Sequence, residues 1–225
     1  MIFERFETCP DAEALAAAAA ARILTLGLAA VQAHGLFRLA LAGGDTPRRC
    51  YERLRASNFD WSRVEIYFGD ERCLPRGDSG RNDTMAGQAW LNHIPLPSGN
   101  CHPIPAELGP EAAAAVYAEV LRPGLPLDLV LLGLGEDGHT ASLFPGNAAL
   151  QQTQPVVPVH SAPKPPAERV SLSLAVLNAA RHKLFLVSGA GKRDVLQRLA
   201  SEPDLPAARI LGAEWLVDRA AWPER

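Results

Sequence analysis

The chain has 225 residues, of which 48% are hydrophobic and 21% charged, so it can bury a substantial core, and we expect a single domain over residues 1–225. Its formal net charge of -3 and the lack of a dense Lys/Arg block argue against a nucleic-acid-binding surface, so any anion site must be local. The four cysteines lie far apart, without C-x-x-C or zinc-finger histidine spacing, which argues against a structural zinc site.

The N-terminal segment predicts a long helix. Asp11 is a suitable helix cap, alanine dominates the residues that follow, and Gly35 suits the helix end. Acidic residues occur early and the apolar residues are mostly alanine, so neither a signal peptide nor a membrane span is expected. We therefore expect a cytoplasmic protein that does not bind membranes.

Four expected strands end in glycines or charged residues. The first covers residues 36–41 and is followed by "GGDTP" and a helix that begins near Pro47. The others lie in "RVEIYFGDERCLP", "PLDLVLLGLGEDGHT" and "RHKLFLVSGAGKRDVLQRLA". Strands that alternate with helical stretches predict an α/β fold, with a mostly parallel, Rossmann-like sheet flanked by helices. Ligands of such sheets bind beyond the carboxyl ends of the strands.

Two irregular segments separate these units. Residues 74–110 and 151–169 are rich in Pro, Gly, Ser and Asn and are predicted to be long loops, which in compact domains are often functional. Residues 169–180, "RVSLSLAVLNAA", begin with polar/apolar alternation. This pattern predicts an edge or antiparallel strand before a short helix.

The glycine pair after the first strand is a candidate anion site. Gly43 and Gly44 let backbone N–H groups approach an anion, the helix start adds partial positive charge, and Thr46 offers a hydroxyl. The spacing matches neither a dinucleotide-binding motif nor a P-loop, so a simple tight turn is the alternative. Asp45 would repel a phosphate, so its side chain is expected to face away.

Charged residues after other strands extend this candidate site. Arg72 has a planar fork that suits a phosphate or carboxylate, and Asp70 or Glu71 could hold it in place, although a solvated loop is the alternative. Lys192 stands at a helix start, where it could contact an anion or remain exposed. Arg169 is a second possible anion contact with the same alternative.

The stretch "GLGEDGHTASLFPG" is the most informative one. His139 is of the side-chain type best suited to proton transfer near neutral pH, and Asp137 could orient its ring. Glycines such as Gly138 allow backbone conformations that bring N–H groups against a substrate. A glycine-rich turn with an incidental histidine is the alternative.

Together, these clusters resemble the 6-phosphogluconolactonase family. The resemblance covers nearly the whole chain: "LAGGDTP" stands where the family usually has G-G-S-T-P, "GDERCLP" matches its D-E-R stretch, and "NDTMA", "GLGEDGHTASLFPG", "PPAERVSLSLAVLNAA" and "LFLVSGAGK" follow in order. It implies hydrolysis of 6-phosphoglucono-δ-lactone without metal or organic cofactor. It also implies that the partner is a phosphosugar lactone, and no obligate protein partner is expected.

The resemblance assigns roles to the candidate residues. It implies that His139 is the general base that activates water and that Asp137 orients it. The phosphate would bind the glycine pair with help from Arg72, Lys192 and Arg169. The sequence order does not show which acid touches His139. The candidates are Asp70, Glu71 and Asp137.

Two alternative functions remain to be separated. The related glucosamine-6-phosphate deaminase/isomerase family has a glutamate where this chain has Phe144, and an apolar ring cannot transfer a proton. Sugar-phosphate-sensing domains of transcription regulators also resemble this fold. They carry a helix-turn-helix, for which we expect no room before the first helix.

Overall fold

A computed structural model describes residues 3–222 of the chain. Six parallel strands form its main sheet, in the order β1-β9-β8-β5-β2-β3. Their bounds are Arg5–Cys9 (β1), Phe37–Leu41 (β2), Val64–Phe68 (β3), Leu129–Leu132 (β5), His182–Val187 (β8) and Glu214–Asp218 (β9). The α/β class is therefore confirmed. The four strands expected from the sequence are the adjacent β8, β5, β2 and β3, so the polar residues that follow them meet at one edge.

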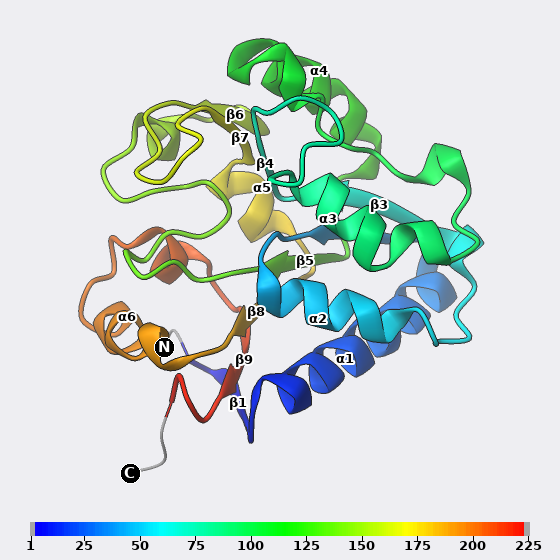
Figure 1. The fold of residues 1–225 in the computed structure, drawn as a ribbon, viewed down its shortest axis with the longest axis horizontal. Coiled ribbons are helices and arrows are strands. Elements are labelled where there is room, and N and C mark those ends of the chain that lie inside the picture. Colours follow the sequence, from blue (N-terminus) through cyan, green and yellow to red (C-terminus); the bar gives the residue numbers. More distant parts are fainter. Residues whose placement is uncertain (1–2, 223–225) are drawn as a thin grey trace.

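Helices flank this sheet (Figure 1). The α-helices are Ala12–His34 (α1), Asp45–Leu54 (α2), Asn82–Ala89 (α3), Pro110–Leu121 (α4), Leu174–Ala179 (α5) and Arg193–Leu199 (α6). Short 3-10 helices are Trp61–Arg63, Leu91–His93, Ser98–Asn100, Ala106–Leu108, Arg122–Gly124, Ala148–Gln151, Ala190–Lys192 and Pro206–Arg209. Figure 1 shows α1 and α2 side by side, as their contacts require.

The predicted caps of α1 are confirmed. The Asp11 carboxylate accepts a hydrogen bond from the Ala14 N–H at 2.8 Å, and Gly35 ends the helix with a φ of 87°. By length and composition alone, α1 also satisfies the criteria for a membrane span, with a mean hydropathy of 1.9, which the alanine-based expectation did not anticipate. In this fold one face of α1 packs on α2 and the sheet, where Leu15 and Ile23 are buried, while Leu28 is 54% exposed.

A second, three-stranded sheet lies beside the first. Asp70–Arg72 (β4), Arg169–Leu172 (β7) and Val156–Val159 (β6) pair antiparallel in the order β4-β7-β6. The antiparallel strand predicted before a short helix is thus confirmed as β7, which is followed by α5. It is the middle strand and not an edge. Residues 70–72 were expected only as charged residues that follow a strand; they form β4, because the chain changes sheets after Gly69, and this sets Arg72 opposite Arg169.

The two predicted loops contain regular structure, so that prediction was wrong in part. The segment 74–110 includes α3, whose first N–H groups are bound by the distant Glu71 carboxylate. The segment 151–169 includes β6, where Pro158 is tolerated because the strand pairs on one side only. Both elements depend on partners far away in the sequence.

Candidate active site

An open cavity of about 200 Å³ lies beyond the carboxyl ends of the four adjacent strands β8, β5, β2 and β3. Seven of the predicted site residues line it: Gly43, Gly44, Asp70, Arg72, His139, Arg169 and Lys192. Four others do not belong to its lining: Thr46, Glu71, Asp137 and Gly138. The residues that follow the four strands therefore lie close together, as predicted.

His139 is held by Asp137. The distance from His139 Nδ1 to Asp137 Oδ1 is 2.5 Å, and the same oxygen accepts from the His139 backbone N–H at 3.1 Å. Burial opposes ionisation of Asp137, but the charge and hydrogen bonds of His139 outweigh it, and the pKa of Asp137 is lowered. An ionised carboxylate can only accept, so Nδ1 carries the proton and Nε2 is the basic nitrogen.

The other two acids have different partners. The buried Glu71 carboxylate accepts from the backbone N–H groups of Arg72 (2.8 Å), Asn82 (2.8 Å) and Asp83 (2.9 Å), and burial raises its pKa to about 7. Asp70 accepts from the Ser142 hydroxyl at 2.6 Å. The acid that touches His139 is therefore Asp137.

Glycines allow the His139 loop to turn tightly. A Cβ on Gly135 would lie 2.0 Å from His139 Nδ1, so only glycine leaves room for the imidazole. Gly138 has a φ of 88°, which residues with a side chain rarely adopt, and it also packs against Leu205. Both features exclude a side chain at this position. The Phe144 ring lies with its centroid 4.5 Å from that of His139. The imidazole is thus fixed by a carboxylate at one nitrogen and by an aromatic neighbour.

The glycine pair after β2 lines the same cavity. Gly44 caps α2 with a φ of 106° and no side-chain hydrogen bond, so the first N–H groups of α2 are not satisfied by a side-chain cap. A Cβ on Gly43 would lie 1.9 Å from Asn82 Oδ1. α2 begins at Asp45, two residues before the predicted start. The Asp45 side chain is 89% exposed and pairs with Arg48, so it faces away as predicted.

Two arginines bring positive charge to the cavity. Arg72 donates from Nη1 to the Gly80 carbonyl at 2.7 Å, and its buried Nε has no partner among the described residues. The expectation that an acid holds this guanidinium was therefore wrong. Arg169 is 6% exposed and lies over the Phe144 ring at 5.4 Å, and burial lowers its pKa. Cationic side chains that line a cavity favour an anionic ligand.

Two lysines complete the positive wall. Burial lowers the pKa of Lys192, the Lys164 charge lowers it further, and Glu136 opposes both effects. Lys164 lines the cavity, and the sequence analysis did not single it out. The signal that could have found it is the scarcity of lysine, of which the chain has three. Asn82, a buried lining residue, was also missed.

Within residues 3–222, no group of three or more His, Cys, Asp or Glu side chains is placed to hold a metal ion. The cysteines in that part of the chain are free thiols.

Comparison with known proteins places this arrangement in context. Residues 10–221 match the family described as glucosamine-6-phosphate isomerases/6-phosphogluconolactonase. The 6-phosphogluconolactonase of Mycobacterium tuberculosis is 39% identical over 96% of both chains, and that of Nostoc is 36% identical over 97% of both. The solved Thermotoga maritima 6-phosphogluconolactonase superposes with a TM-score of 0.89 at 28% identity, covering 95% of this chain and 99% of its own.

A solved monomeric glucosamine-6-phosphate deaminase shares the fold as well. It superposes with a TM-score of 0.84 at 21% identity, over 98% of this chain and 100% of its own. The fold is thus common to two chemistries, and the residues of the site must separate them.

Proposed function

The chain belongs to the glucosamine-6-phosphate isomerase/6-phosphogluconolactonase family, and on this premise we propose that it hydrolyses 6-phosphoglucono-δ-lactone to 6-phosphogluconate. The observation that carries the proposal is the 2.5 Å contact of His139 with Asp137 at a cavity that is lined by four cationic side chains. We place this reaction in the oxidative pentose phosphate pathway and the enzyme in the cytoplasm.

His139 acts as the general base. Its Nδ1–H donates to Asp137, so the lone pair of Nε2 is free to take a proton from a water molecule. The water oxygen attacks the lactone carbonyl carbon, and the carbonyl becomes a tetrahedral oxyanion. Asp137 stabilises the imidazolium that forms in this step.

The same histidine then acts as the general acid. The bond between the carbonyl carbon and the ring oxygen breaks, and His139 Nε2–H gives its proton to that oxygen, which becomes a hydroxyl. The new carboxylic acid releases a proton to solvent. Backbone N–H groups of the glycine-rich loop after β5 are the candidates for stabilising the oxyanion.

The phosphate is bound at the positive side of the cavity. Gly43 and Gly44 bring the N-terminus of α2 to the surface, and Thr46 in its first turn can add a hydroxyl. Arg72, Arg169 and Lys192 supply positive charge. The side chains of all three line the same cavity as the glycine pair, which supports this assignment.

Deamination of an amino sugar is disfavoured by one side chain. Phe144 stands where the related deaminases have the glutamate that assists ring opening, and its ring is 2% exposed and packs on His139. It offers no group that can move a proton. A sugar-phosphate sensor needs no His139–Asp137 pair, so that pair favours an enzyme.

The test is an assay of freshly generated 6-phosphoglucono-δ-lactone by proton release, corrected for spontaneous opening, with glucosamine 6-phosphate assayed for ammonia release in parallel. We expect rapid lactone opening and no ammonia. Ammonia release without lactone opening would assign the deaminase reaction instead. Binding of 6-phosphogluconate without turnover of either substrate would indicate a sensor.

A further inference from the structure

We propose that Lys164 is a substrate-phosphate contact and that Arg169 positions it by shaping the loop that carries it. This inference rests on the proposed function and deepens it. It adds a binding residue that the sequence motifs do not mark, and it gives Arg169 a second role besides its charge. Lys164 lies in the segment 160–168, the Pro loop, which joins β6 to β7.

The Pro loop is moulded around the Arg169 side chain. Arg169 Nε donates to the Pro166 carbonyl at 3.1 Å, and Nη2 donates to the Lys164 carbonyl at 2.8 Å. These carbonyls are available because the loop is rich in proline, which supplies no N–H to compete for them. A buried cation bonded to backbone carbonyls therefore fixes the path of the chain on both sides of Pro165.

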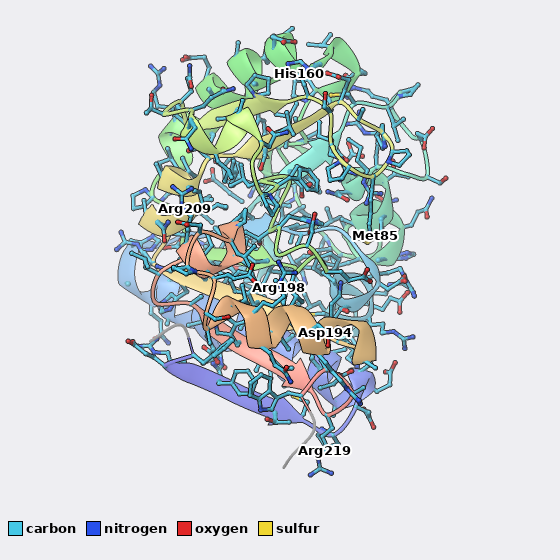
Figure 2. The ribbon with its side chains drawn as sticks, turned by 90° about the vertical axis from the view of Figure 1, so that its left-hand side faces the viewer. Met85, His160, Asp194, Arg198, Arg209 and Arg219 are labelled. Carbon is cyan, nitrogen blue, oxygen red and sulfur yellow. The ribbon has the colours of Figure 1, made fainter. Side chains whose placement is uncertain are left out.

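The two ends of the Pro loop are also anchored. The Ala162 N–H donates to the Ala167 carbonyl at 2.9 Å, which closes the base of the loop. His160 lies 2.5 Å from Glu168 through Nδ1 and 2.7 Å from Glu111 of α4 through Nε2. Figure 2 shows His160 at the upper end of the molecule, so this anchor lies at the outer side of the fold. Prolines within an anchored loop reduce its freedom, so the backbone at Lys164 is held in place before substrate arrives.

The Lys164 side chain has no counterion of its own. It lines the cavity, and its ammonium has no hydrogen-bond or ion-pair partner among residues 3–222. It is close enough to Lys192 for the two like charges to oppose each other. Such repulsion is relieved when a dianion binds to both ammonium groups, and the phosphate of the substrate carries that charge.

Lys164 and Arg169 therefore have different roles in this proposal. Lys164 supplies the ammonium that contacts the phosphate, and Arg169 keeps the backbone of Lys164 at the cavity. Lysine can replace the charge of Arg169 but cannot donate to two carbonyls from a planar fork. This difference makes the two roles separable by mutation.

The test is a double-mutant cycle with Lys164→Ala and Arg169→Lys, measured as KM and kcat on 6-phosphoglucono-δ-lactone and on the unphosphorylated glucono-δ-lactone. For Lys164→Ala we expect KM to rise about tenfold on the phosphorylated substrate with kcat nearly unchanged, because one charge-assisted contact is lost. The unphosphorylated lactone should not distinguish this variant from the wild type. Arg169→Lys should reproduce the rise in KM, and the double variant should add little to it.

Lys183→Ala is the matched control, because it removes a lysine from β8 that does not line the cavity. An unchanged KM in Lys164→Ala would overturn the proposal, and so would an equal loss on both lactones. Fully additive effects would overturn the positioning role of Arg169. Lys164 is exposed, so its variant tests the main claim even if Arg169→Lys does not fold.

Inorganic phosphate separates this inference from the proposed function. If the wild type does not open the lactone but binds phosphate, and Lys164→Ala weakens that binding, the contact stands while the hydrolase assignment fails. If the wild type opens the lactone and its phosphate affinity is unaffected by Lys164→Ala, the contact fails while the hydrolase assignment stands.

Discussion

In the mechanism that we propose, a single short contact, between His139 and Asp137, determines the chemistry at the scale of residues. The carboxylate fixes the proton on Nδ1 and stabilises the charged ring that forms when Nε2 accepts a proton. The hydrogen bonds to Asp137, together with the neighbouring Phe144 ring, hold His139 in one orientation, and we expect the cations of the cavity to act on the other end of the substrate. Mutation of the base should therefore change kcat, and mutation of the binding groups should change substrate affinity.

Replacing Asp137 by Asn should lower kcat while substrate binding survives. The amide can still accept from Nδ1–H, but it carries no charge to stabilise the imidazolium, so we expect kcat to fall at least about a hundredfold. The comparison is kcat by proton release against the affinity for 6-phosphogluconate by calorimetry. A kcat within about twofold of the wild type would remove Asp137 from the mechanism.

Removing one cationic side chain from the phosphate side of the cavity should weaken substrate binding and leave kcat nearly unchanged. We expect Arg72→Ala or Lys192→Ala to weaken 6-phosphogluconate binding by roughly 2 kcal/mol, because a charge-assisted hydrogen bond is lost. The rate at saturation should change little. Arg122→Ala is the control, since its side chain is 72% exposed and pairs with Glu119 on the surface. Unchanged affinity in either cavity variant would take that residue out of the phosphate site.

At the scale of elements, the start of α3 supports the glycine turn that we propose binds the phosphate. Glu71 binds the first N–H groups of α3, and Asn82 in its first turn packs its side chain against Gly43. The buried carboxylate thus acts at a distance from the substrate, through the position of a helix end.

Gly43→Ala tests the close approach of these elements. The new Cβ would lie 1.9 Å from Asn82 Oδ1, so the turn or α3 must move, and we expect affinity for 6-phosphogluconate to fall at least about tenfold. Gly99→Ala is the matched control, because a Cβ there meets nothing within 4 Å. Equal affinities in the two variants would show that the turn does not need its present shape.

Glu71 should make the stability of the protein depend on pH near neutrality. Burial raises its folded pKa to about 7 from an ordinary value of 4.5, so the folded state binds the proton more tightly than the unfolded state. This contribution is present below the unfolded pKa and is lost as pH rises through the folded value.

Denaturant unfolding of the wild type and Glu71→Gln, from about pH 5 to about pH 8, checks this sign. We expect the wild type to lose stability relative to the variant by roughly 3 kcal/mol at most as pH rises, since one pKa unit corresponds to about 1.4 kcal/mol. A pH-independent difference, or a wild type that gains stability relative to the variant with rising pH, would contradict the assignment.

The elements that the sequence predicted are those with a strong local pattern. β2, β3, β5 and β8 are apolar runs that end in glycine or charge, and α1 has its cap and its terminal glycine. The elements that were not predicted include β1, β9, α3 and β6. Each is short, and each depends on hydrogen bonds to residues outside its own segment. Arg72 was expected to be held by an acid, but Glu71 binds backbone N–H groups instead, which no local pattern reveals.

At the scale of the whole molecule, parallel strand order assembles the site. Gly43, Arg72, His139 and Lys192 lie far apart in the sequence, and each follows one of four adjacent strands, so their meeting was predictable. The second sheet brings Arg169 and the Pro loop over the same cavity. That part was not predictable, because the change of sheet after Gly69 has no signal in hydrophobic periodicity.

The most direct test of the central claim is hydrolysis of fresh 6-phosphoglucono-δ-lactone by the wild type and by His139→Ala, with 6-phosphogluconate affinity measured on both. The account predicts fast lactone opening by the wild type, loss of most of it in the variant, and nearly equal affinities. A variant that still opens the lactone at the wild-type rate, or that loses hydrolysis and binding together, would contradict the role of His139 as the base.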